Sequence, residues 1–201
     1  MKKLRIYSDA GSFNNGHKDP DKPMFGSYGC LIVSEDNRII YQFSDWYEEI
    51  TNNQGELFGF IKAFYEFLKR YKSKEKYEIE VISDSQYLIH GVNQYLSGWK
   101  KKKWKNSSGE IVKNKKMWQI IDRMINLYPD LIKFKFTWQK GHVGKKTSLE
   151  EDPNVYFNEM CDSLATEKIN YASGEENTMI CPENEFDNLI DDIFKKLKIK
   201  E

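Results

Sequence analysis

The chain has 201 residues, enough for one domain with a full core and a short appendage. Its 31 Lys and Arg balance its 31 Asp and Glu, so no overall field draws the protein to nucleic acid or to an anionic membrane. Three Cys without a CxxC spacing argue against a disulfide framework or a zinc site, and the lack of a long apolar run predicts a cytoplasmic protein without a membrane span.

An acidic residue follows the first predicted strand. Apolar and polar residues alternate over Leu4–Tyr7, which predicts a β-strand that delivers Asp9 into a turn at residues 10–12. Turn chemistry by itself explains such an acid, because Asp before Gly and Ser bonds nearby backbone amides. Residues 13–27 then predict a long loop. The acid needs further support before it indicates a function.

Three strands and a helix follow one another in the first third of the chain. Tyr28–Val33 and Arg38–Phe43 are strand-like and, with the first strand, predict an antiparallel meander. From Thr51 onward, apolar residues recur at helical spacing, and residues 51–53 supply N-cap chemistry. Glu56 lies in the first helical turn, at the border of the apolar face, where capping alone also explains it.

A second strand also ends in an acid. Glu78–Ser83 is strand-like and is followed by Asp84. Helices are predicted near residues 86–95 and 117–127, with a strand at 132–139 between the second of them and the rest of the chain. Three strands followed by alternating strands and helices predict a mixed sheet flanked by helices.

The last part of the predicted domain carries a histidine and a further acid. His142 stands between two glycines, and a helix is predicted over Val155–Ile169. Asn158 and Asp162 are four residues apart and therefore share one flank of that helix. The domain is predicted over residues 1–170.

Residues 171–201 form an acidic extension with a predicted amphipathic helix, which either packs on the domain or docks a protein partner. We expect the protein to be a monomer.

A basic and aromatic segment lies in the middle of the chain. Eight Lys and one Glu occupy residues 99–116, and Trp99, Trp104 and Trp118 interleave with them. A solvated charge run does not explain the tryptophans, which need a surface to pack on or a base to stack on. The segment predicts a nucleic-acid-binding surface.

Four carboxylates recur at positions that one simple cause does not explain. Two follow strands, one begins a helix and one lies on a late helix. Carboxylates that converge repel one another unless cations lie between them. Oxygen ligands favour hard divalent ions, so the pattern predicts Mg²⁺, with Mn²⁺ as the alternative. No serine stands in a Ser-His-Asp arrangement with a base of its own.

Six stretches in chain order resemble one family. They are YSDAGS, TNNQGELFGF, VISDSQYLI, GWKKKKWK with VKNKKMWQIID, WQKGHVG and NEMCDSLA. Together they resemble a type 1 ribonuclease H with a basic protrusion. The resemblance implies an RNase H-like five-stranded sheet and hydrolysis of the RNA strand of RNA/DNA hybrids by two metal ions, leaving 5′-phosphate and 3′-hydroxyl ends. The chain departs from the family pattern at Ala10, inserted in the first turn, and in its long loop at residues 143–157.

The resemblance also assigns roles to residues. It implies that Asp9, Glu56, Asp84 and Asp162 bind metal and that His142 assists proton transfer or product departure. The residues expected to contact the hybrid are Gly11, Ser12, Thr51, Asn52, Asn53, Gln54, Trp99, Lys100, Lys101, Lys102, Trp104, Lys105, Asn114, Trp118 and Asn158. Two alternatives stay open: a non-catalytic hybrid-binding module, and a DNA-directed nuclease or transposase of the same fold.

Overall fold

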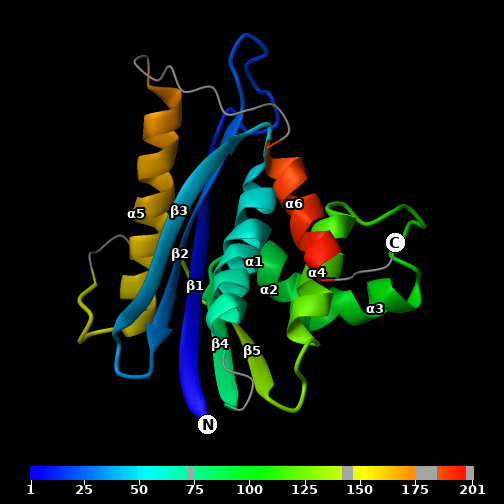
Figure 1. Ribbon diagram of the computed structural model, residues 1–201. Coiled ribbons are helices and arrows are strands. Elements are labelled where there is room, and N and C mark those ends of the chain that lie inside the picture. Colours follow the sequence, from blue (N-terminus) through cyan, green and yellow to red (C-terminus); the bar gives the residue numbers. More distant parts are fainter. Residues whose placement is uncertain (72–74, 142–146, 175–184, 198–201) are drawn as a thin grey trace.

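The computed structural model describes residues 1–71, 75–141, 147–174 and 185–197. Within them, five strands form one mixed sheet in the order β3-β2-β1-β4-β5 (Figure 1). The strands are β1 (Lys2–Phe13), β2 (Phe25–Ser34), β3 (Ile39–Glu48), β4 (Tyr77–Ser83) and β5 (Ile132–Trp138). β1, β2 and β3 pair antiparallel, whereas β4 pairs parallel with β1 and β5. The predicted fold class is confirmed.

Helices cover both faces of this sheet (Figure 1). α1 (Asn52–Arg70) packs on β1 and β2 from one side, and α5 (Pro153–Ser173) packs on β1, β2 and β3 from the other. The side of α1 also carries α2 (Gln86–His90), the π-helical turn η1 (Gly91–Tyr95), α3 (Leu96–Lys101), α4 (Lys115–Ile125) and α6 (Glu185–Lys196). Among the residues described, no helix is long and apolar enough to cross a membrane.

Side chains of β1 alternate between these two layers. Ile6 joins the core cluster that contains the apolar face of α1, whereas Tyr7 packs with Phe157 and Cys161 of α5. Because successive strand residues point to opposite faces, Asp9 lies on the same face as Tyr7, toward α5. β1 therefore directs its acid to the layer that carries Asp162.

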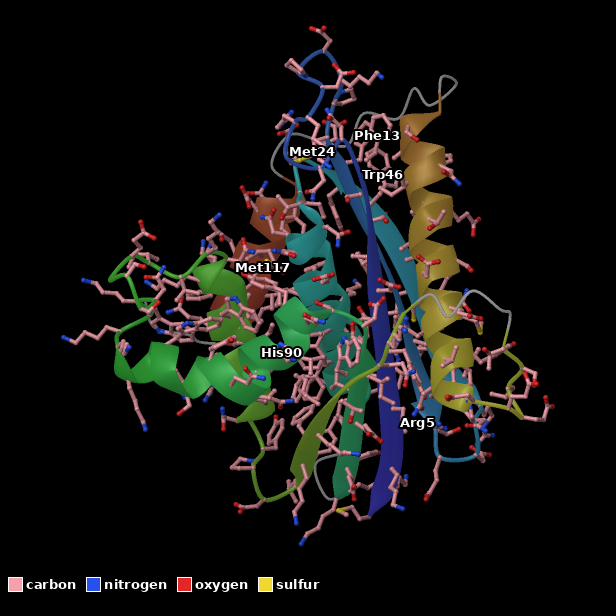
Figure 2. All side chains as sticks on the ribbon, turned by 180° about the vertical axis from the view of Figure 1, so that it is seen from behind. Arg5, Phe13, Met24, Trp46, His90 and Met117 are labelled. Carbon is pink, nitrogen blue, oxygen red and sulfur yellow. The ribbon has the colours of Figure 1, made fainter. Side chains whose placement is uncertain are left out.

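The turn predicted immediately after Asp9 is wrong. β1 continues to Phe13, and its partners in β2 run from Gly29, opposite Asp9, to Phe25, opposite Phe13. Phe13 packs beside Phe25 and Trp46 at the end of α5, where Figure 2 places Phe13 and Trp46 close together. Pairing with a long neighbouring strand and this apolar cluster outweigh the local preference of Ala-Gly-Ser for a turn.

The start of α1 agrees with the prediction. Thr51 is the N-cap, its side chain accepts from the Gln54 N–H, and the Gln54 side chain accepts from the Thr51 N–H, which completes a capping box. Leu57, Phe60 and Phe64 of the same helix are fully buried. The cap and the buried face together fix the position of Glu56, one turn into the helix.

The extension at the end of the chain packs on the domain. Phe186, Ile190 and Ile193 of α6 are buried and belong to the main core cluster. Phe186 contacts the rings of Tyr47 and Phe58, with ring centroids 5.3 and 5.1 Å away. The apolar face of the predicted amphipathic helix therefore packs on the domain.

Candidate active site

Asp9 is the buried centre of the candidate site. Its side chain is 8% exposed, and its Oδ1 accepts a hydrogen bond of 2.7 Å from the Ala10 N–H. Burial raises the pKa of Asp9 to about 8, the charge of Asp84 adds to the rise, and Asp162 and Glu56 add further to it. Asp84, Asp162 and Glu56 therefore all lie within electrostatic range of Asp9.

Glu56 reaches this group from α1. Burial raises the pKa of Glu56, and the Asp84 charge adds to that rise, while a hydrogen bond from Ser85 opposes it. The Ser85 hydroxyl donates to Glu56 Oε2 at 2.5 Å, and the Asn52 side-chain amide donates to Oε1 at 3.2 Å. Two fixed donors thus orient the carboxylate, one from the turn after β4 and one from the start of α1.

Asp84 follows the end of β4, as predicted, and the chain after β5 lies against it. The Trp138 indole N–H donates to the Asp84 carbonyl at 3.0 Å. A Cβ added to Gly141 would lie 2.0 Å from Asp84 Oδ2, far inside any real contact. Only glycine permits this approach of the backbone to the carboxylate. His142, the predicted proton-transfer residue, is outside the described residues.

Asp162 and Asn158 occupy one flank of α5, as their spacing predicts. Asn158 is only 3% exposed, so its side chain, predicted to contact the substrate, is covered in this structure. Close packing of α5 on β1 and β2 accounts for this burial. Its amide oxygen, Oδ1, is buried without a hydrogen-bond partner, which leaves an acceptor one helical turn from Asp162.

The donor set fits a hard divalent cation. Within the described part of the chain, no three His, Cys, Asp or Glu side chains stand as they are in an arrangement that holds a metal ion. The chemistry of the group nevertheless consists of carboxylate oxygens, with an unpartnered amide oxygen nearby. Burial and like charge raise the pKa of Asp9, and a bound cation opposes both effects.

One edge of β1 is open next to Asp9. Pairing of β1 with β4 ends at Tyr7, whereas pairing with β2 continues to Phe13. The Ser8 carbonyl faces the β4 side, where it accepts from the Ser83 hydroxyl. Because peptide groups alternate along a strand, those of Ser12 face this open edge and those of Gly11 face β2. Ser12 is thus the better placed of the two predicted backbone contacts.

The first turn of α1 lies beside the carboxylates. Asn52 bonds Glu56 directly, and Asn53 is exposed. Thr51 and Gln54 are half-buried and are engaged with each other in the capping box. These predicted contacts are therefore positioned by the same helix start that positions a carboxylate.

The three tryptophans of the basic segment have different environments. Trp118 is fully buried, and its indole N–H donates to the Tyr87 hydroxyl at 3.2 Å. Its ring fills the space that a Cβ at Gly91 would occupy. Trp118, predicted to contact the substrate, is thus covered in this structure, because α4 turns this residue into the core. Trp99 and Trp104 remain half-buried at the surface.

The lysines of this segment belong to a protrusion, residues 99–116, which runs from the end of α3 to the start of α4. Lys101, Lys102 and Lys105 are exposed, whereas Lys100 pairs with Asp122 at 2.8 Å. An isolated antiparallel β-bridge pairs the backbones of Lys105 and Ile111 and closes the loop between them. Asn114, in the left-handed conformation, donates to the Tyr87 hydroxyl at 3.2 Å. The exposed lysines give the protrusion its local positive charge.

Two residues that position the carboxylates are missing from the sequence-based prediction. Ser85 caps α2 by accepting from the Leu88 N–H and also donates to Glu56. Gly141 provides the close approach to Asp84. The Ser that directly follows Asp84, at the start of a predicted helix, is a signal for Ser85. The approach of Gly141 depends on the parallel neighbours β4 and β5, and no local pattern indicates it.

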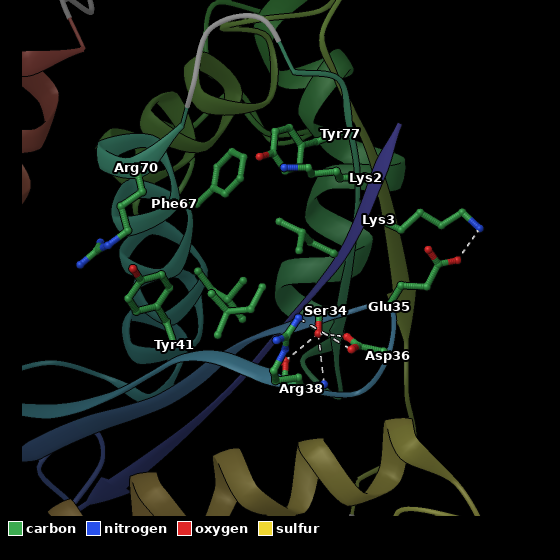
Figure 3. Close-up of a pocket in the computed structure, with 13 residues that line it drawn as sticks. Lys2, Lys3, Ser34, Glu35, Asp36, Arg38, Tyr41, Phe67, Arg70 and Tyr77 are labelled. Carbon is green, nitrogen blue, oxygen red and sulfur yellow. Dashed lines mark hydrogen bonds and ion pairs between the residues drawn. The ribbon is translucent and has the colours of Figure 1, made fainter.

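A separate cavity lies at the other end of the sheet (Figure 3). It has a volume of about 730 Å³ and is lined by Lys2, Tyr41, Phe67 and Arg70, among others. It contains none of the predicted catalytic residues, although it is larger than any other described here. Its cations already have acidic partners, such as Glu75 for Lys2.

Comparison with known proteins gives the chain its relatives. A family model described as RNase H matches residues 1–170. A ribonuclease H of Actinobacillus pleuropneumoniae serotype 5b is 32% identical over 176 residues, covering 88% of this chain and 96% of the relative. A ribonuclease H of Acetivibrio thermocellus is 33% identical over 170 residues, covering 84% of this chain and 96% of the relative.

Solved structures share the fold. LC9-RNase H1, described as a type 1 RNase H with the type 2 active-site motif, superposes with a TM-score of 0.62 at 19% identity, covering 100% of this chain and 86% of that one. LC11-RNase H1 in complex with an RNA/DNA hybrid gives a TM-score of 0.56 at 18% identity, covering 84% of this chain and 98% of that one.

Proposed function

The chain belongs to the RNase H family and is a ribonuclease H, and from that premise we propose that Asp9, Glu56, Asp84 and Asp162 form its catalytic centre. The observation that carries the proposal is the convergence on buried Asp9 of β1 of three further acids, Glu56 of α1, Asp84 at the end of β4 and Asp162 of α5, whose charges all raise the pKa of Asp9. No requirement of folding brings four like charges together.

The family uses divalent metal ions. We infer two Mg²⁺, with Mn²⁺ as an alternative, held by the four carboxylates. When bound, such ions supply the positive charge that favours attack of water on a phosphodiester and stabilises the departing oxygen. The chain itself orients the ligands: Ser85 and Asn52 hold Glu56, the Ala10 N–H holds Asp9, and Gly141 leaves room for Asp84.

Binding of the hybrid is assigned to two surfaces. The exposed lysines of the protrusion, Lys101, Lys102 and Lys105, contact phosphates, and Trp99 and Trp104 flank them. The open edge of β1 at Ser12 and the first turn of α1 lie beside the carboxylates. These groups are suited to contact the 2′-hydroxyls that distinguish RNA from DNA.

The finer assignments follow from the resemblance. They are the type 1 class, the 5′-phosphate and 3′-hydroxyl products, and the part of His142 in proton transfer or product departure. Asn158 lies one helical turn before Asp162, and its buried side-chain oxygen has no hydrogen-bond partner.

A substrate panel tests the proposed function. The purified full-length chain is incubated with an end-labelled RNA/DNA hybrid, duplex DNA and duplex RNA, with Mg²⁺, with Mn²⁺ or with EDTA. We expect internal cleavage of the RNA strand of the hybrid only, and only with metal. Cleavage of duplex DNA would instead support a DNA-directed nuclease of this fold. Binding of the hybrid without cleavage in either metal would support a non-catalytic module.

A further inference from the structure

The extension α6 lies beside the predicted substrate surface. It falls outside residues 1–170, the part that the family model matches. Its apolar face is buried in the core through Phe186, Ile190 and Ile193, so the helix has a fixed position. Its polar face is therefore also fixed in relation to α1 and α4, which Figure 1 shows next to it.

A groove of about 390 Å³ joins α6 to residues already assigned to the substrate surface. Gln54 at the start of α1 and Asn114 and Lys116 at the start of α4 line one side. Asp187 and Asp191 of α6 line the other side. A nucleic-acid strand that follows the protrusion toward α1 thus meets two carboxylates at this groove.

One of these carboxylates holds a lysine of the protrusion. Lys116 Nζ lies 2.5 Å from Asp191 Oδ1 and 5.9 Å from the centre of the Phe194 ring. Both members of the ion pair are almost half exposed, at 47% and 45% of their side-chain surface. Exposed pairs of this kind contribute little to stability. The pair does, however, engage a cation that would otherwise be available to a phosphate.

We propose that Asp187 and Asp191 of α6 set the nucleic-acid affinity of the enzyme, by holding Lys116 and by repelling phosphates from the groove beside Gln54 and Asn114. The inference rests on the proposed function, since it concerns the surface that binds the hybrid. A phosphate competes with the Asp191 carboxylate for one lysine, and Asp187 adds repulsion at the same place. The acidic edge therefore weakens backbone contacts, which carry no information on strand type.

The chain offers a matched control for the test. Asp192 is the neighbour of Asp191 on α6, but it pairs with Lys196 on the same helix at 2.5 Å and does not line the groove. Asp191→Asn and Asp192→Asn make the same change in net charge and differ only in where they make it. Asp187→Asn is a second, independent variant at the groove.

Binding of a fluorescent hybrid and of duplex DNA is measured by anisotropy in EDTA, at several salt concentrations. Asp191→Asn is expected to tighten binding of both about threefold to tenfold at low salt, with one more counterion released per complex. Asp187→Asn is expected to tighten binding without that steeper salt dependence. Asp192→Asn is expected to change the affinity by less than about twofold, because an exposed, paired charge outside the groove contributes little.

Lys116→Gln completes the test. In the wild type it is expected to weaken binding slightly, whereas in the Asp191→Asn background it removes the gain. This inference would be overturned if the three variants Asp191→Asn, Asp187→Asn and Asp192→Asn bound the hybrid with equal affinity. If the wild type still bound and cleaved the hybrid, the proposed function would stand. A wild type that neither binds nor cleaves the hybrid contradicts the proposed function and this inference with it.

Discussion

Asp9 is a buried acid on a strand, and three other acids lie close enough to raise its pKa. Burial raises its pKa to about 8, and the neighbouring charge of Asp84 adds to the effect. Near neutral pH without metal, the site therefore retains a proton that an exposed Asp would release. A bound divalent cation displaces that proton, so metal binding and ionisation of Asp9 are linked.

The first prediction concerns the metal-free protein. Because folding raises the pKa of Asp9, the stability from its protonated form is complete below the unfolded pKa near 4 and is lost as pH rises through about 8. Urea unfolding in EDTA is expected to show a loss of about 3 kcal/mol between pH 6 and pH 9. Asp9→Asn cannot titrate and should lack this component. The same pH dependence in wild type and variant would contradict the assignment.

The second prediction concerns Gly141. An added Cβ would overlap Asp84 Oδ2, so Gly141→Ala must displace the carboxylate or the backbone after β5. We expect the fold to persist and hybrid cleavage to fall at least about tenfold, since small misplacements of catalytic groups are costly. Gly98→Ala in α3 is the control, because an added Cβ there meets no atom within 4 Å. Equal cleavage rates for the two variants would show that Asp84 tolerates displacement.

At the scale of elements, local sequence patterns predict where most helices and strands occur. They do not predict how far a strand extends or which side chains the neighbouring elements bury. The capping box of α1 is encoded within four residues, so its start is predicted from sequence. The extent of β1 depends on its partner β2, and turn chemistry at Ala10 to Ser12 misleads. Trp118 shows the same limit: its burial depends on Gly91 in a neighbouring π-helical turn.

The third prediction concerns α6 as an element of the core. Ile193 is 1% exposed, so Ile193→Ala leaves a cavity and should lower the free energy of unfolding by about 2 to 4 kcal/mol. Asn188→Ala, at an exposed position of the same helix, is expected to change it by less than about 0.5 kcal/mol. Chemical denaturation of both variants measures the difference. Equal stabilities would mean that α6 does not belong to the cooperative core.

At the scale of the whole molecule, the sheet gathers residues that lie far apart in the sequence. Side by side, β1 and β4 bring Asp9 and Asp84 together, and helices on opposite faces add Glu56 and Asp162. The identities of these four acids are predictable from motifs in chain order. The contacts that orient them, such as Ser85 with Glu56, are not, because they depend on packing between α1 and α2.

The position of the acidic extension also depends on the whole molecule. Its amphipathic pattern allows either packing on the domain or docking of a partner. The structure buries the apolar face and leaves Asp187 and Asp191 at the groove beside the protrusion. The chain has no net charge, but the basic protrusion and the acidic α6 meet at this groove, where Lys116 pairs with Asp191.

The proposed catalytic centre is the cluster of Asp9, Glu56, Asp84 and Asp162, and groups outside this cluster, among them the exposed lysines of the protrusion, also hold the hybrid. Cleavage rate and hybrid affinity, measured side by side with Mg²⁺ for wild type, Asp9→Asn and Asp84→Asn, test it most directly. We predict that each substitution lowers the cleavage rate by at least about 1,000-fold, as expected when metal-dependent chemistry is lost, while affinity stays within about threefold of the wild type. Cleavage retained in either variant would contradict the account.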